Sequence, residues 1–346
     1  MRPTTKDLAK AAGVSLATVD RVLNERPGVR PKTVEAVTEA IARIGFVRNQ
    51  SAANLARQKV YRLAFLLPEN GDQFRDALTA SIAEARQTLA SDAIQIATQA
   101  ALPNDPHRTA DLIAGLSAED LDGVAIMAPA SPQVRDATLR LAQAGVAVVS
   151  FVSGQQNDVA FDFVGIDNRA AGATVGRLLG RFAGGQTGKI LVVAETMTAL
   201  DSVERRLGFD QIMTREFPNL TVLPSLETHG REDRAQKIIG HAYRHHNNIV
   251  GVYVIATEGR QALSAILKTT DPKRQVIVAH EHTGFTERLL VTGCLDAIIA
   301  QSTGHLVRSA VRTLKARIDG QEPIASQERI RIEILLRENL GLPHQS

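Results

Sequence analysis

TKDLAKAAGVSLATVDRVLN, residues 5–24, is the stretch that decides the architecture of the amino-terminal part of the chain. Thr5 is a suitable N-cap for a first helix, because its hydroxyl can accept a hydrogen bond from a free backbone N–H. Gly13 then supplies a turn, and Ser15 can cap a second helix over residues 16–23. The pattern predicts two short helices joined tightly through glycine, which is the helix-turn-helix arrangement.

A third helix is predicted to follow the second. Pro31 suits its first turn, and Gly45 suits its carboxyl end. Its apolar residues recur at helical spacing and share one stripe. They are Val34, Val37, Ile41 and Ile44. We expect an all-α headpiece of three helices packed around a few aliphatic side chains.

Residues 5–24 also carry a family resemblance, together with KTVEAV at 32–37, IGFVRN at 44–49 and AANLAR at 52–57. The four segments strongly resemble the headpiece of the lactose-repressor (LacI/GalR) family. The resemblance implies a homodimer that binds pseudo-palindromic operator DNA as a transcriptional regulator. It implies a repressor released by a small-molecule effector, with a co-repressor or an activator as the alternatives.

By this resemblance, the helix over residues 16–23 lies in the major groove, where Leu16 and Ala17 can contact thymine methyl groups. Arg21 would bind a guanine or a phosphate. Asp20 replaces the serine usual in the family, and we expect it to accept from a cytosine amine or to orient Arg21. The expected DNA contacts are, in full, Thr5, Ser15, Leu16, Ala17, Thr18, Asp20, Arg21, Asn24, Arg30, Asn49, Ala52 and Leu55.

Residues 49–60 follow the headpiece and begin with NQSAANLAR, which has helical spacing but little that one chain could bury. In the family, the matching segment is a hinge helix that folds on DNA. Leu55 matches the leucine that enters the minor groove, and Ala52 and Ala56 flank it. The local sequence alone leaves an ordinary exposed linker as the alternative.

Charge is distributed unevenly along the chain. Residues 1–62 contain 12 Lys and Arg against five Asp and Glu, whereas the remaining chain contains 28 against 32. A cationic module on a mildly acidic body is what binding to DNA phosphates requires. A solvated basic face is the alternative that charge alone leaves open.

From Tyr61 onward, apolar runs alternate with helical patterns. The expected buried strands are residues 63–67, 94–98, 123–128, 146–151, 163–166, 190–194, 251–255, 276–279 and 297–300. The expected helices include residues 77–90, 135–144, 169–182, 205–216 and 234–245. Repeated βα units favour an α/β fold with parallel sheets covered by helices on both faces.

This body resembles the sensor domain of the same family, which is similar to periplasmic sugar-binding proteins and has two lobes. The resemblance implies three crossings between the lobes, which we place near Asp162, Thr283 and Asp319. The expected division is a headpiece over 1–48, a hinge over 49–60 and an effector-binding and dimerisation domain over 61–346. Within this domain the amino-terminal lobe is expected at 61–162 and 284–318, and the carboxy-terminal lobe at 163–283 and 319–340.

Polar residues at the ends of the predicted strands match effector-binding positions of the family. They are Asn70, Phe74, Asp167, Arg205, Thr257, Glu281 and Gln301. A stacking aromatic, carboxylates, a guanidinium and amides together suit a sugar, a polyol or a sugar phosphate. Each residue singly could instead be a helix cap or part of an ion pair. AHEH at 279–282 and Thr257-Glu258 depart from the family, and could favour a phosphorylated, acidic or nitrogenous effector.

Patterns that would indicate an enzyme are incomplete. AGGQTGK at 183–189 resembles a phosphate-binding loop, but Ile190 stands where a Ser or Thr would hold magnesium, and the segment follows a helix. No GxGxxG follows the strand over residues 63–67, which argues against a bound dinucleotide. We therefore expect a binding protein and not an enzyme, with no cofactor. A periplasmic transport receptor, the rival binding module, would not need the basic headpiece.

Histidine and cysteine patterns predict neither a resident metal nor a disulfide. His241 and His245 lack the glutamate of HExxH, and a metal at residues 280–282 stays an alternative. Cys294 is the single cysteine, which fits a reducing compartment. Because the amino terminus has no secretory pattern and no segment approaches ~20 apolar residues, we expect a cytoplasmic protein without membrane contact.

Overall fold

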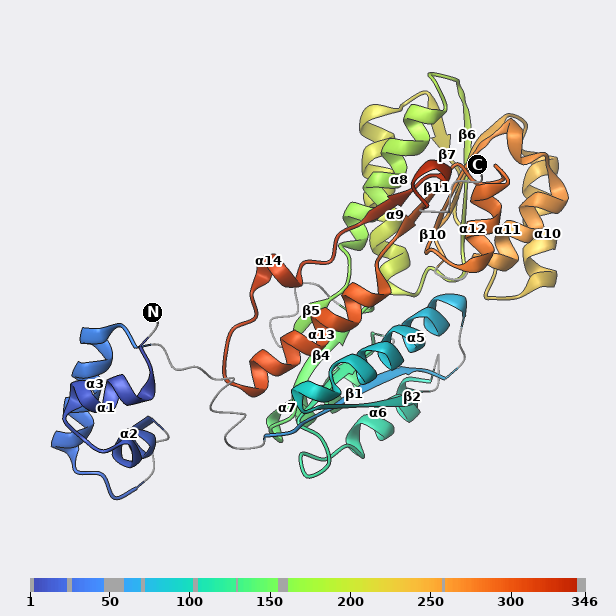
Figure 1. Cartoon of the computed structure of the whole chain (residues 1–346). Helices are drawn as coiled ribbons and strands as arrows, with labels where there is room; N and C mark the ends of the chain where they lie inside the picture. Colours follow the sequence, from blue (N-terminus) through green and yellow to red (C-terminus); the bar gives the residue numbers. More distant parts are fainter. Residues whose placement is uncertain are drawn as a thin grey trace. The chain divides into compact units, whose positions relative to one another are not determined.

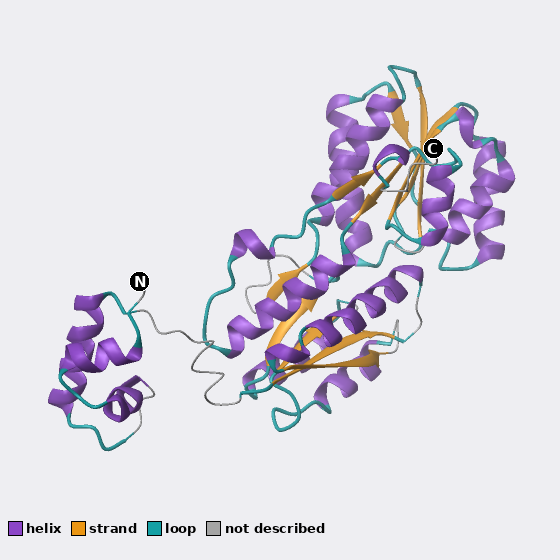
Figure 2. Ribbon diagram, in the orientation of Figure 1, coloured by secondary structure: helices purple, strands orange, loops and turns teal. Residues whose placement is uncertain are grey.

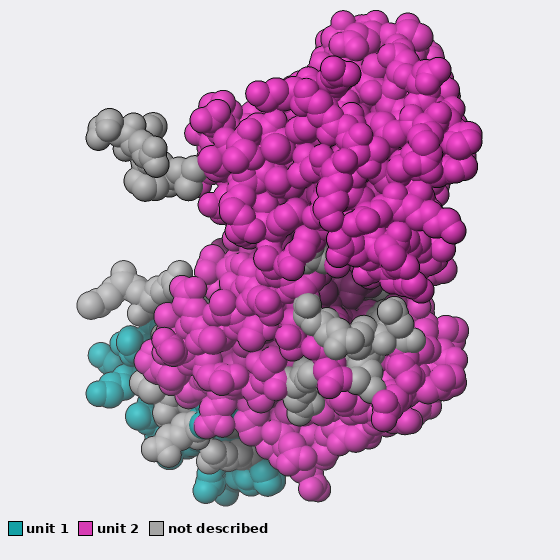
Figure 3. Space-filling model, turned by 90° about the vertical axis from the view of Figure 1, so that its right-hand side faces the viewer, with its two compact units in different colours: residues 1–60 teal, residues 61–346 magenta. Residues whose placement is uncertain are grey.

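The computed structural model describes residues 3–23, 27–46, 59–69, 72–101, 105–128, 130–154, 161–256 and 259–340. The chain divides into two compact units, Met1–Val60 and Tyr61–Ser346 (Figure 3). No helix among the described residues is long and apolar enough to cross a membrane.

The first unit contains α1 (Thr5–Ala12), α2 (Leu16–Leu23) and α3 (Pro31–Ile44), the three helices expected from the sequence. The three helices place fully buried side chains in a shared core, namely Leu8 of α1, Val19 of α2, and Val37 and Ala40 of α3. Buried Phe46 and partly buried aliphatic side chains close this core, which is small because a unit of this size can bury little.

The residue that caps α1 is Thr4, so the prediction of Thr5 was wrong by one position. The Thr4 hydroxyl accepts from the Asp7 backbone N–H at 3.3 Å, and the Asp7 carboxylate accepts from the Thr4 backbone N–H at 2.8 Å. A capping box pairs the cap with the residue three positions later in the sequence. Thr4 meets this spacing to Asp7, whereas Thr5 is the first residue inside the helix.

The amino-terminal lobe of the second unit has a five-stranded parallel sheet in the order β2-β1-β3-β4-β5. Its strands are β1 (Tyr61–Pro68), β2 (Ile94–Ala101), β3 (Gly123–Ile126), β4 (Ala147–Phe151) and β5 (Asp162–Val164). Its helices are α5 (Gln73–Thr88), η1 (Ala90–Asp92), α6 (Pro106–Ala114), α7 (Pro132–Gln143) and α13 (Thr303–Ile318). Phe65 of β1 packs with Phe74, whereas Leu66 packs in the cluster that contains Ile113, so both faces of the sheet are covered (Figures 1 and 2).

The carboxy-terminal lobe has a seven-stranded sheet with β12-β11-β10-β9-β6-β7 in order and β8 beside β6. Its strands are β6 (Gly188–Ala194), β7 (Leu220–Val222), β8 (Leu226–Glu227), β9 (Ile249–Val254), β10 (Val276–His280), β11 (Ala297–Ala300) and the antiparallel β12 (Glu333–Leu335). Its helices are α8 (Asn168–Phe182), α9 (Leu200–Glu216), α10 (Glu232–His245), α11 (Arg260–Thr269), η2 (Pro272–Arg274), α12 (Gly284–Val291) and η3 (Arg337–Asn339). A short helix, α14 (Ala325–Glu328), precedes β12.

The second crossing between the lobes differs from the expected position at Thr283. After β10, the chain continues through α12 into β11, which pairs with β10 in parallel in the same sheet. A strand, a helix and a parallel strand form one βαβ unit, so residues 284–300 stay in the carboxy-terminal lobe. The chain returns to the other lobe only with α13, which contacts β3 and β4.

Candidate effector-binding and DNA-binding sites

The outer surface of α2 carries the side chains predicted to contact DNA. Leu16 is 47% exposed, and Ala17, Asp20 and Arg21 are also exposed, as are Thr5 and Arg30 elsewhere in the headpiece. Buried Val19 fixes which face of α2 points outward. This arrangement suits a helix that reads a groove with one exposed face.

Ser15 and Thr18 have a structural role at the start of α2. The Ser15 hydroxyl accepts from the Thr18 backbone N–H at 3.1 Å, and the two hydroxyl oxygens lie 2.8 Å apart. Their contacts with DNA, which the family resemblance implies, remain predictions. The other predicted DNA contacts lie outside the described residues, and they are Asn24, Asn49, Ala52 and Leu55.

A buried polar cluster lies where β9, β10 and β11 end. Arg205 of α9 is 3% exposed, and its three nitrogens each have a partner. Nε donates to Asn168 Oδ1 at 2.9 Å, Nη1 donates to the Ile255 carbonyl at 3.0 Å, and Nη2 lies 3.5 Å from Glu281 Oε1. Gln301 Nε2 donates to the same Glu281 oxygen at 3.0 Å. Three of the predicted effector-binding residues are therefore in contact.

Glu281 is the centre of this cluster. Its backbone is in the left-handed region, with φ of 62°, and its N–H donates to the Ile299 carbonyl at 2.8 Å. Burial raises the pKa of the Glu281 carboxyl to about 7, against the opposing effects of Arg205 and the Gln301 hydrogen bond. Oε2 of Glu281 and Oε1 of Gln301 are buried acceptors without a hydrogen-bond partner among the described residues.

Two other predicted effector contacts have different places in the structure. Phe74 is 1% exposed and packs inside the hydrophobic core with Phe65, so its assignment as a stacking aromatic was wrong. Asp167 is the N-cap of α8 and accepts from the Ala170 backbone N–H at 2.9 Å. Asn70 and Thr257 lie outside the described residues.

The two histidines beside Glu281 have separate partners. Buried His280 places Nε2 2.7 Å from the Tyr253 hydroxyl, and burial holds the pKa of His280 well below its usual value. His282 is half-exposed and contacts Glu287 at 2.9 Å. Across the described residues, no group of three His, Cys, Asp or Glu side chains is arranged to hold a metal.

Comparison with known proteins identifies both parts of the chain. Residues 4–49 match the family of bacterial regulatory proteins called the lacI family, and residues 63–322 match the periplasmic binding protein domain. The chain thus contains a lacI-family domain followed by a periplasmic binding protein domain. The match to the second domain spans most of the chain and includes Arg205, Glu281 and Gln301.

Individual relatives agree with this assignment. Catabolite control protein A of Priestia megaterium is 38% identical over 82 residues, which are 24% of this chain and 25% of that protein. The aligned region therefore spans about a quarter of the length of that relative.

Solved structures share the fold of the second unit. One is a LacI transcriptional regulator of Bacteroides fragilis, described as putative, with a TM-score of 0.71 and 18% identity, covering 83% of this chain and all of that one. Another is a solute-binding protein of Burkholderia graminis in complex with D-arabinose, with a TM-score of 0.71 and 19% identity, covering 82% of this chain and 98% of that one.

The raised pKa of Glu281 predicts that stability depends on pH. The folded protein holds this proton more tightly than the unfolded chain, so the stabilisation is complete below the ordinary value of 4.5 and is lost as pH rises through about 7. The loss is at most about 3 kcal/mol. We expect Glu281→Gln to remove this part of the pH dependence, measured as the difference between urea unfolding curves of the two proteins from pH 5 to pH 8. If the free energies of unfolding of the two proteins changed with pH in the same way, the prediction would be contradicted.

Proposed function

We propose that this protein is a sequence-specific DNA-binding transcriptional regulator, acting as a homodimeric repressor whose operator affinity is set by a small molecule. The observation that carries the proposal is the pairing of two parts in one chain. A lacI-family headpiece exposes Leu16, Ala17 and Arg21 on α2, and a periplasmic binding protein domain follows it. Such a pairing couples a DNA-reading surface to a ligand-controlled equilibrium.

The proposed effector is a polyhydroxylated compound that contacts the buried cluster, and within this class we propose a sugar. Arg205 supplies donors, whereas Glu281 and Gln301 supply acceptor oxygens that lack partners among the described residues. Sugar hydroxyls both donate and accept, so they can satisfy both kinds of group. The solute-binding protein with D-arabinose shares the fold, which supports the choice of class.

Fluorescence anisotropy of a labelled duplex tests the proposal. The duplex is taken from upstream of the gene that encodes this chain and is titrated with the full-length protein at two salt concentrations. We expect tight binding that weakens with salt, because Lys and Arg displace counterions from phosphates. A panel of sugars, polyols and sugar phosphates is then added, and release of the duplex by one compound identifies the effector. Binding to none of the upstream fragments, with or without the compounds, would contradict the proposal.

Substitutions on α2 test which residues read the operator. Arg21→Ala is expected to weaken operator binding by ~1–3 kcal/mol, whereas Asp20→Ser is expected to change which operator sequence is preferred. Arg140→Ala removes one positive charge from an exposed site on the second unit and serves as the control. An unaltered sequence preference in Asp20→Ser would rule out its proposed contact with a base or with Arg21.

A further inference from the structure

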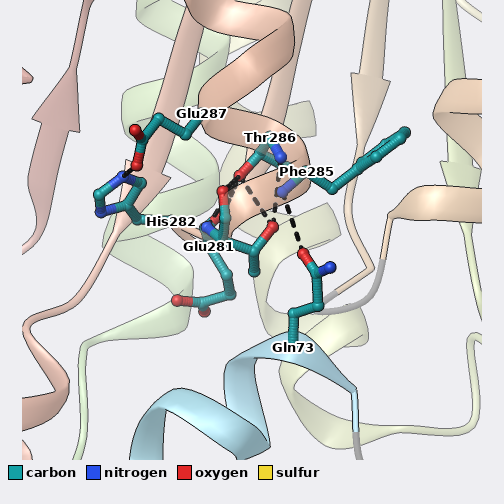
Figure 4. Close-up of polar contacts among 7 residues, drawn as sticks. Gln73, Glu281, His282, Phe285, Thr286 and Glu287 are labelled. Carbon is teal, nitrogen blue, oxygen red and sulfur yellow. Dashed lines mark hydrogen bonds and ion pairs between the residues drawn. The ribbon is translucent and has the colours of Figure 1, made fainter.

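A hydrogen bond joins the two lobes of the second unit. Gln73 is the first residue of α5 in the amino-terminal lobe, and its Oε1 accepts from the backbone N–H of Phe285 at 3.0 Å. Phe285 is the second residue of α12 in the carboxy-terminal lobe. Figure 4 shows Gln73 extending from α5 to the backbone at the start of α12. The N–H groups in the first turn of a helix have no partner within that helix, so Gln73 satisfies one of them from the other lobe.

The start of α12 is in turn fixed to Glu281. The Thr286 hydroxyl donates to the Glu281 carbonyl at 2.8 Å, and the Thr283 hydroxyl accepts from the Thr286 backbone N–H at 3.2 Å. Glu281 itself is held in a left-handed conformation, which few side chains adopt without such support. Hydrogen bonds through Thr286 therefore link the first turn of α12, which contains Phe285, to the Glu281 backbone.

We propose that Gln73 is a positioning residue: when the lobes approach, it fixes α12 and thereby sets the place of Glu281 in the buried cluster. The proposal rests on the proposed function, since it gives that effector site its link to the opposite lobe. A neutral hydrogen bond of this kind changes the ratio of closed to open lobes by about fivefold.

The alternative is that the hydrogen bond between Gln73 and Phe285 forms without affecting lobe closure. Three variants distinguish this alternative from the proposal. Gln73→Met keeps the length of the side chain and its suitability for a helix but removes the acceptor. Gln73→Glu keeps an acceptor oxygen at the same place, where the amino terminus of α12 also favours a negative charge. Gln87→Met is the matched control, because Gln87 is an exposed glutamine near the other end of the same helix.

The readout is the distance between two spin labels, one on each lobe, measured by double electron–electron resonance. Ala114→Cys on α6 and Lys237→Cys on α10 place spin labels at exposed sites of the two lobes, with Cys294→Ser removing the native thiol. Labelled full-length protein is mixed with excess unlabelled protein so that only pairs within one chain contribute, without DNA or sugar.

We expect Gln73→Met to raise the ratio of open to closed lobes about fivefold, which increases the population at longer distances. The distributions of Gln73→Glu and Gln87→Met should stay close to that of wild type. Identical distributions for Gln73→Met and wild type would overturn the proposal. A shift in Gln87→Met as large as in Gln73→Met, or a Gln73→Glu distribution like that of Gln73→Met, would also overturn it. Because no DNA is present, these outcomes are independent of the duplex titration that tests the proposed function.

Discussion

Arg205→Met is expected to lower the free energy of unfolding by about 3–5 kcal/mol at pH 8, because it leaves a buried carboxylate without its cation. The side chains of Arg205 and Glu281 are only 3% and 1% exposed, so water cannot replace the lost partner. The Asn168 side chain and the Ile255 carbonyl also lose their donors. Urea unfolding followed by circular dichroism measures the loss, and the response of the DNA complex to the sugar panel should disappear.

Two companion variants make this result specific. Arg140→Met removes an arginine that is 61% exposed and paired with Asp136, and it should change stability by less than about 1 kcal/mol. Glu281→Gln added to Arg205→Met should restore part of the lost stability, because it removes the uncompensated charge. If Arg205→Met costs no more than Arg140→Met, the buried pair has no such role.

The fold class could be predicted because the apolar runs of buried strands and the helical spacing of apolar residues can each be recognised within a short segment of sequence. The expected α/β body with parallel sheets is confirmed, and all nine expected strands are present with ends that differ by a few residues. The crossing after Ala300 could not be predicted in the same way. Membership in a sheet depends on pairing, and β11 is apolar enough to fit either lobe.

The site could be predicted only in part, because strand ends show where a side chain starts and not where it points. Arg205, Glu281 and Gln301 meet as a cluster, while their role in binding an effector stays a prediction. Asn168, which holds Arg205, was missed although it follows the capping residue Asp167. For Phe74 the signal was available: Phe74, Leu78, Ile82 and Ala85 recur at helical spacing, which indicates the buried face of α5.

Arg205 also depends on how closely α8 and α9 approach each other. Gly172 of α8 faces the backbone of α9, where an added Cβ would lie 1.8 Å from the Arg205 carbonyl oxygen. From the other side, a Cβ on Gly208 of α9 would lie 1.9 Å from the Arg169 carbonyl oxygen. The two glycines let the helix backbones touch, and this approach brings the Arg205 side chain to Asn168.

Gly172→Ala is therefore expected to destabilise the protein by about 3 kcal/mol or more, because the atoms in its way are backbone and cannot turn aside. The helices must separate, and Arg205 must leave its partners. Gly240→Ala is the matched control on α10, where the nearest atom is the flexible end of Arg244 at 3.4 Å. An alanine there should stabilise the helix by about 0.5–1 kcal/mol. Unfolding curves of the two variants should thus move in opposite directions from wild type. A Gly172→Ala protein as stable as wild type would mean that the close approach of α8 and α9 does not hold Arg205 in place.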